Sequence, residues 1–98
     1  MQEDHNSMGW SAGRKLRRLL GNVSSILAIE AACAAQALDL RSPLQPGHAT
    51  SAVLERIRQD VPFIQDDTFM TPHLEAAERL VSSGALVEAA ERATGPLA

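Results

Sequence analysis

The side chains that could do chemistry are few, and their spacing matches no metal site or catalytic pattern. His5, His48 and His73 lie far apart, and no arrangement of cysteines or carboxylates around them has the spacing of a zinc site. We therefore expect no metal ion, and we expect His48 and His73 to be exposed at the surface. The single cysteine, Cys33, lies in an Ala-rich helical run, which favours a small buried hydrophobe over a nucleophile.

Charged residues form one local cluster near the amino terminus, which comprises Arg14, Lys15, Arg17 and Arg18. Residues three and four apart on a helix can reach carboxylates on neighbouring helices, so we interpret the cluster as solvated or engaged in ion pairs between chains. The whole chain has nine Lys and Arg against twelve Asp and Glu, a net charge of -3, and no aromatic residue interrupts the cluster. Nucleic acid is therefore not an expected partner. We expect Glu30 to pair with a cation on another helix, and Trp10 to anchor packing.

Composition indicates an all-α fold of one structural unit. The 98 residues are 45% apolar but only 3% aromatic, and Ala and Leu dominate the apolar set. Small side chains of high helix propensity favour closely packed helices over a sheet. A chain of this length has room for one modest core.

The apolar pattern predicts one long helix from Gly13 to about Asp39. Apolar residues recur three and four apart in two stripes, one comprising Leu16, Leu20, Val23, Leu27, Ala31, Ala34 and Leu38, the other Leu19, Ile26, Ile29, Cys33 and Ala37. Two stripes are typical of a helix surrounded by others. Such a rod is roughly 40 Å long, whereas a compact domain of this size has a radius of gyration of about 13 Å. We therefore expect further chains, or a segment absent from this one, to pack against the helix.

Three short helices follow in the prediction, which divides the chain into a polar segment at 1–12, the long helix at 13–40 and a short-helix subdomain at 41–98. Pro43, Pro46 and Gly47 end the long helix. The short helices run from about Thr50 to Asp60, from an N-cap at Thr71 to Gly84, and from there to Gly95. Val53, Ile57 and Val61 share one face of the first of these helices, and Leu86, Val87 and Ala90 are the apolar residues of the last. The buried face expected for the middle helix comprises Leu74, Ala77, Leu80 and Val81. A single turn is also possible at 66–69.

Neither a membrane-spanning segment nor a secretory signal is predicted. The long helix is interrupted by Glu30 and begins with four cations, and residues 1–5 are polar and acidic. One cysteine allows no internal disulfide. We expect a cytoplasmic protein.

Several segments together resemble the carboxyl-terminal part of histidine ammonia-lyases, in the aromatic amino acid lyase family. The first is the opening, Gln2-Glu3-Asp4-His5-Asn6-Ser7-Met8-Gly9-Trp10, followed by Arg14-Lys15-Leu16-Arg17, Ile26-Leu27-Ala28-Ile29-Glu30 and Cys33-Ala34-Ala35-Gln36-Ala37-Leu38-Asp39. The others are Leu44-Gln45-Pro46-Gly47, Val61-Pro62-Phe63 and Ser83-Gly84-Ala85-Leu86-Val87. The resemblance therefore spans nearly the whole chain.

The resemblance implies a site at the amino terminus. Glu3 matches the acidic residue beside the family's catalytic ring, and Gln2 and His5 would be substrate-binding neighbours. The family eliminates ammonia through a methylidene-imidazolone ring made from its own Ala-Ser-Gly tripeptide. This chain contains no Ala-Ser-Gly and no tyrosine, so it carries no such cofactor itself. Asn6 stands where histidine lyases commonly have valine, a departure that bears on substrate identity.

Two hypotheses follow. In the first, the chain is a carboxyl-terminal segment of a histidine ammonia-lyase, inactive alone, which associates with itself through the long helix or with the missing amino-terminal part of the lyase. The family's active sites combine several subunits of a homotetramer, and only the intact enzyme would bind the amino acid. In the second hypothesis, the chain is a stand-alone helical module that binds or assembles with another protein.

Overall fold

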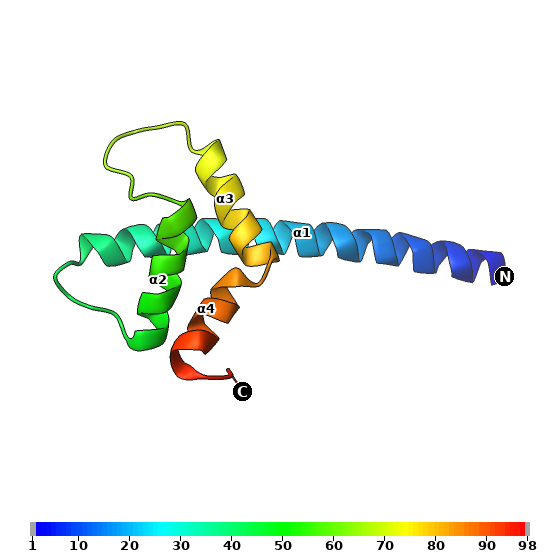
Figure 1. The fold of residues 1–98 in the computed structure, drawn as a ribbon. Helices are drawn as coiled ribbons and strands as arrows, with labels where there is room; N and C mark the ends of the chain where they lie inside the picture. Colours follow the sequence, from blue (N-terminus) through cyan, green and yellow to red (C-terminus); the bar gives the residue numbers. More distant parts are fainter. Residues whose placement is uncertain (1, 98) are drawn as a thin grey trace.

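The fold consists of one long helix and three short ones that gather beside its carboxyl-terminal half (Figure 1). A computed structural model describes the backbone of residues 2–97 and the side chains of residues 9–97. The helices are α1 (Gln2–Leu40), α2 (His48–Asp60), α3 (Thr71–Ser82) and α4 (Ala85–Thr94). No strand occurs in the described backbone. The predicted all-α class, with one long helix followed by three shorter ones, is confirmed.

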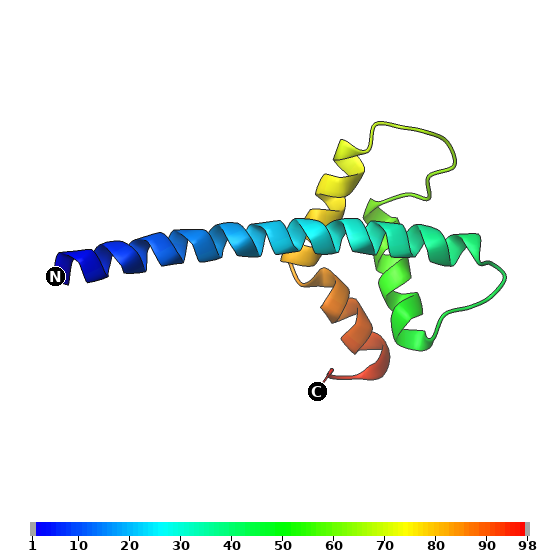
Figure 2. The same cartoon turned by 180° about the vertical axis from the view of Figure 1, so that it is seen from behind.

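Helix α1 extends far beyond the body formed by α2, α3 and α4. Its 39 residues form a rod of about 58 Å at a rise of 1.5 Å per residue, and the molecule measures 64 × 37 × 17 Å. The radius of gyration is 17.7 Å, against about 13 Å for a compact domain of this length. Both views show the amino-terminal half of α1 projecting away from the other helices (Figures 1 and 2). The expectation that the rod outreaches its own domain is therefore confirmed.

The backbone of α1 passes through the boundary predicted at residue 13. Residues 2–12, expected as a polar segment, are helical. They contain no proline, so nothing in this segment removes a backbone donor or blocks a helical turn. Polar residues and a glycine lower helix propensity by only about 0.5–1 kcal/mol each, so they do not by themselves end a helix.

The core lies where the carboxyl-terminal half of α1 meets α2 and α3, whereas α4 packs mainly against α2. Ala28 and Ala35 are the buried residues of α1, and they pack in one cluster with Ile57, Val61, Ala76, Ala77 and Leu80. Alanine at these positions lets helix axes approach closely, and close approach lets a core of small side chains exclude water. Ala77 and Leu80 of the predicted buried face of α3 lie in this cluster, together with Ile57 and Val61 of the apolar face predicted for α2. Ala90 of α4 is buried as well, whereas Val87 is exposed.

The ends of the short helices agree with the predicted stop signals, with two corrections. Gly84 between α3 and α4 has φ +77°, and Gly95 after α4 has φ +90°, both in the region that favours glycine. Thr71 is the first residue of α3 rather than its N-cap, which is Met70. Residues 66–69 form no helical turn.

By length and composition alone, one segment of the described chain would suffice to cross a membrane. It is Gly9–Leu40 of α1, and only 11% of its most apolar window is buried. Core helices of soluble proteins pass the same test, so the segment is a weak indication of a membrane span.

Candidate functional site

The three predicted site residues, Gln2, Glu3 and His5, lie outside the side chains that the structure describes. Their backbone forms the first turns of α1. That end of the helix is remote from α2, α3 and α4 (Figures 1 and 2). The role implied for Glu3 therefore stays a prediction.

The described side chains of the projecting half of α1 are exposed throughout. Leu16, Leu19 and Leu20 each expose more than half of their surface, and Trp10 exposes 70%. Trp10 therefore anchors no packing against the described helices, which corrects the expectation. The guanidinium of Arg14 lies 5.7 Å from the centre of its ring. In this half of α1, large apolar side chains are exposed and none of the described helices covers them.

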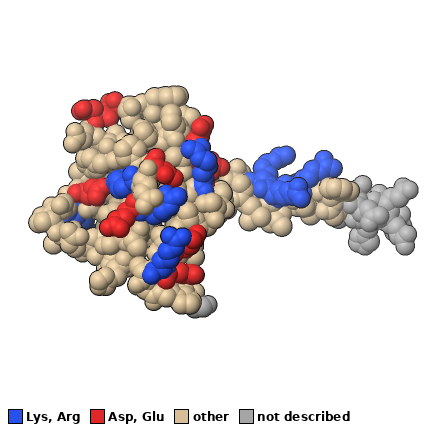
Figure 3. Space-filling model, in the orientation of Figure 1, with Lys and Arg blue, Asp and Glu red and all other residues tan. Residues whose placement is uncertain are grey.

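Cations gather on the same projecting part. Figure 3 shows them as one blue group on the rod, whereas charges of both signs are mixed over the body. They are Arg14, Lys15, Arg17 and Arg18, all exposed. None of them pairs with a carboxylate among the described side chains, where the ion pairs are Arg56–Asp60, Arg58–Asp39 and Arg92–Glu88. Glu30 is likewise exposed and has no ion pair there, so its expected partner is not in this part of the chain.

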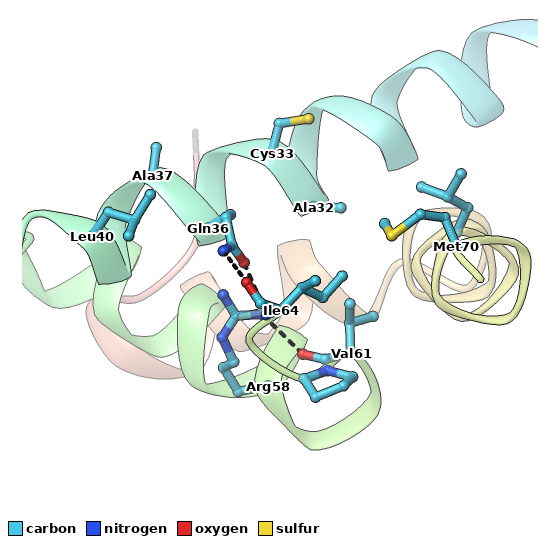
Figure 4. A pocket seen from close by; sticks show the side chains of 11 residues that line it. Ala32, Cys33, Gln36, Ala37, Leu40, Arg58, Val61, Ile64 and Met70 are labelled. Carbon is cyan, nitrogen blue, oxygen red and sulfur yellow. Dashed lines mark hydrogen bonds between the residues drawn. The ribbon is translucent and has the colours of Figure 1, made fainter. Parts of the chain in front are cut away.

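A polar clamp holds the loop after α2 against the carboxyl-terminal half of α1 (Figure 4). The Gln36 side chain donates from Nε2 to the Ile64 carbonyl at 2.7 Å and accepts from the Ile64 amide at 3.2 Å. One side chain thus satisfies both polar groups of a backbone unit that belongs to no helix or sheet. This pairing fixes the loop without a further secondary-structure element.

Arg58 of α2 joins the clamp from the other side. Its Nε donates to Asp39 Oδ2 at 2.7 Å, and its Nη2 forms an ion pair with the same oxygen at 2.6 Å. Its Nη1 donates to the Val61 carbonyl at 2.9 Å, and its guanidinium lies 5.9 Å from the Phe63 ring centre. Arg58 therefore connects α1, the end of α2 and the loop. Sequence reasoning missed both Gln36 and Arg58, although a glutamine in an Ala-rich core helix is a signal that a backbone partner exists.

A cavity of about 420 Å³ lies beside the clamp, between α1, the loop and the start of α3 (Figure 4). Its apolar lining includes Ala37, Leu40 and Met70, and Cys33 lies at its edge. Cys33 is exposed, which corrects the prediction of a buried small hydrophobe. The cavity presents few polar atoms, so it suits an apolar side chain better than a charged substrate.

Among the described residues, no group of three or more His, Cys, Asp and Glu is arranged to hold a metal ion. His48 is exposed as predicted, whereas His73 in the first turn of α3 is half-buried.

Comparisons with known proteins identify the class. The family model of the aromatic amino acid lyases matches residues 1–59, which include all of α1 and most of α2. This chain belongs to the aromatic amino acid lyase family. No solved structure matches it.

Curated relatives of this chain include histidine ammonia-lyases of several bacteria. That of Streptomyces avermitilis is 50% identical over 99 residues, which cover 100% of this chain and 19% of the relative. Those of Streptomyces coelicolor and Symbiobacterium thermophilum are 47% and 46% identical, over 99% and 98% of this chain and 19% of each relative. The resemblance seen in the sequence is therefore confirmed, and the chain spans about 19% of the length of the relatives it matches.

Proposed function

We propose that this chain is the carboxyl-terminal assembly segment of a histidine ammonia-lyase, a cytoplasmic enzyme of histidine catabolism that converts histidine to urocanate. The observation that carries the proposal is the uncovered apolar surface of α1, where Leu16, Leu19 and Ile26 are each more than half exposed. Apolar surface of this extent marks an interface. The names of the relatives and their greater length support a lyase as its context.

The chain would not catalyse deamination alone. The family's electrophilic ring is made from Ala-Ser-Gly, and this chain has Ser11-Ala12-Gly13 and Ser82-Ser83-Gly84 but no Ala-Ser-Gly. Its residues therefore do not fit the group. General acid–base assistance contributes roughly 10² to 10⁴ in rate, far less than removal of an unactivated β-proton requires.

What the chain would contribute to the intact enzyme is the carboxylate of Glu3, with Gln2 and His5 as substrate-binding neighbours. A carboxylate suits the site because it can pair with the substrate imidazolium or accept a proton. Because Glu3 belongs to the first turns of α1, the position of its carboxylate would depend on how α1 packs in the assembly. Assembly and catalysis would thus be coupled through one helix.

The proposal is tested by complementation. The Streptomyces avermitilis relative is produced without the segment that aligns with this chain and is mixed with this chain, and urocanate formation is measured. The relative's own segment serves as the positive control. We expect activity from the mixture and none from either part, and Glu3→Gln should lower kcat by roughly 10² to 10⁴. The matched variant Glu55→Gln, on the exposed face of α2, should leave activity unchanged.

Two results would overturn the proposal. Turnover of histidine by the purified chain would show that the missing tripeptide is not required. An inactive mixture, with activity restored by the relative's own segment, would instead favour the second hypothesis, a stand-alone helical module that uses α1 to bind another protein.

A further inference from the structure

The exposed apolar residues and the cations of the projecting half of α1 lie on different sides of the helix. Successive residues of an α-helix are turned by about 100°, which places the large apolar side chains of residues 16–27 within an arc of about 120°. We call this surface the apolar arc; its members, all exposed, are Leu16, Leu19, Leu20, Val23, Ile26 and Leu27. Arg14, Arg17 and Arg18 lie on the opposite side, and Lys15 lies at the edge of the arc. The segment is therefore an amphipathic helix with a basic polar side.

The body of α2, α3 and α4 leaves the apolar arc open. Ala28 and Ala35, the buried residues of α1, point roughly 120–140° away from the middle of the arc. No other helix lies beside the projecting half (Figures 1 and 2). A flat surface can therefore meet the arc along this half of α1 without collision with the body.

We propose that the projecting half of α1 binds the surface of an anionic lipid membrane and lies parallel to it. Amphipathic helices with a basic polar side bury the apolar side about 5–10 Å deep, at the boundary between head groups and acyl chains. The lipid phosphates supply the anions that the four cations lack among the described ion pairs. The inference goes beyond the proposed lyase role, because this surface is free for lipid only while the chain is outside an assembled enzyme.

A helix that lies on the membrane fits the chain better than one that spans it. A span over residues 19–40 would place Glu30 among the acyl chains, where a charged side chain is costly. It would also separate Ala28 and Ala35 from the core that they form with α2 and α3. A position on the surface leaves Glu30 in water and the core intact.

An anionic lipid surface also fits better than a polyanion in solution. A nucleic acid would pair with the cations but would leave the apolar arc exposed to water. The arc contains no aromatic side chain on which bases could stack. Lipid accounts for both sides of the helix, since its head groups pair with the cations and its acyl chains cover the arc.

Sedimentation with vesicles tests the inference on the whole chain. It should bind vesicles of phosphatidylglycerol and phosphatidylcholine in equal parts. It should bind phosphatidylcholine alone at least tenfold more weakly, because each cation near an anionic surface contributes about fivefold. Leu16→Gln, near the middle of the apolar arc, should weaken binding roughly tenfold. Leu44→Gln, which changes an exposed leucine after α1, should not, and neither variant alters the core or the helix content seen by circular dichroism.

Paired arginine variants test the role of charge. Arg14→Gln combined with Arg18→Gln should weaken binding to the anionic vesicles roughly 25-fold. The matched control is Arg41→Gln combined with Arg79→Gln, which removes the same charge from two exposed arginines outside the projecting half. It should weaken binding far less.

Tryptophan fluorescence tests the orientation. Trp10 is the single tryptophan and lies on the basic side of α1, beside Arg14. Leu16→Trp in a Trp10→Phe background should shift its emission to shorter wavelength with anionic vesicles, because the ring enters the apolar layer. The emission of Trp10 in the unaltered chain should shift less.

Several results would refute the inference. They are equal binding to the two kinds of vesicle, equal effects of Leu16→Gln and Leu44→Gln, equal effects of the two arginine pairs, and equal shifts of the two tryptophans. Binding to a DNA duplex as tight as to anionic vesicles would show that the cations act without the arc. A chain that stays in solution with anionic vesicles would show that protein, not lipid, covers the arc. Complementation of the truncated relative depends on none of these results, so the proposed function would survive them.

Discussion

Removal of the Arg58 side chain should destabilise the fold more than any other loss of one surface charge. The Arg58 and Asp39 side chains are 21% and 31% exposed, between a buried ion pair and a solvated one, so we assign their interaction about 1 kcal/mol. The hydrogen bond to the Val61 carbonyl adds about 1 kcal/mol, and the contact with the Phe63 ring about 0.5 kcal/mol. Arg58→Ala should therefore lower the free energy of unfolding by about 2–3 kcal/mol.

The assay is urea unfolding followed by circular dichroism at one protein concentration, because association would otherwise shift the apparent stability. Asp39→Ala should cost about 1 kcal/mol alone and little in the Arg58→Ala background. The matched variant is Arg56→Ala, whose partner Asp60 lies 3.4 Å away within the same helix and more exposed; it should cost less than about 0.5 kcal/mol. Equal effects of Arg58→Ala and Arg56→Ala would refute the view that Arg58 connects three elements.

Two further predictions concern the backbone. Gly84→Ala should lower the free energy of unfolding by about 1 kcal/mol in the same assay, because φ is +77° there although a methyl group would meet no atom within 4 Å. Gly21→Ala, in the middle of α1 and equally unhindered, should instead raise the free energy of unfolding by up to about 1 kcal/mol. If both substitutions changed the stability in the same direction, the left-handed conformation of Gly84 would not be the cause. Gln36→Leu should accelerate hydrogen exchange of the Ile64 amide, whereas the Val61 amide, bonded to Ile57, should stay protected; unchanged exchange at Ile64 would exclude the clamp.

The local sequence pattern was sufficient to predict most of the helices of this chain and where they end. Periodicity predicted the long helix and its carboxyl-terminal end, and proline and glycine marked the breaks. These features depend on residues within a few turns of one another. The resemblance to the lyase family came from the order of several segments along nearly the whole chain. The missing Ala-Ser-Gly could also be read directly, and with it the expectation of no independent activity.

Only the tertiary structure decided which side of α1 is covered. The two apolar stripes were visible in the sequence, but not which of them is covered. Ala28 and Ala35 are buried because α2 and α3 lie against them. Cys33 is exposed because no described helix covers its side chain. The clamp was equally hidden, since Gln36 and Ile64 are 28 residues apart and meet only when the chain folds back. A helical pattern shows which residues share a face; which face is covered depends on segments that folding brings from elsewhere in the chain.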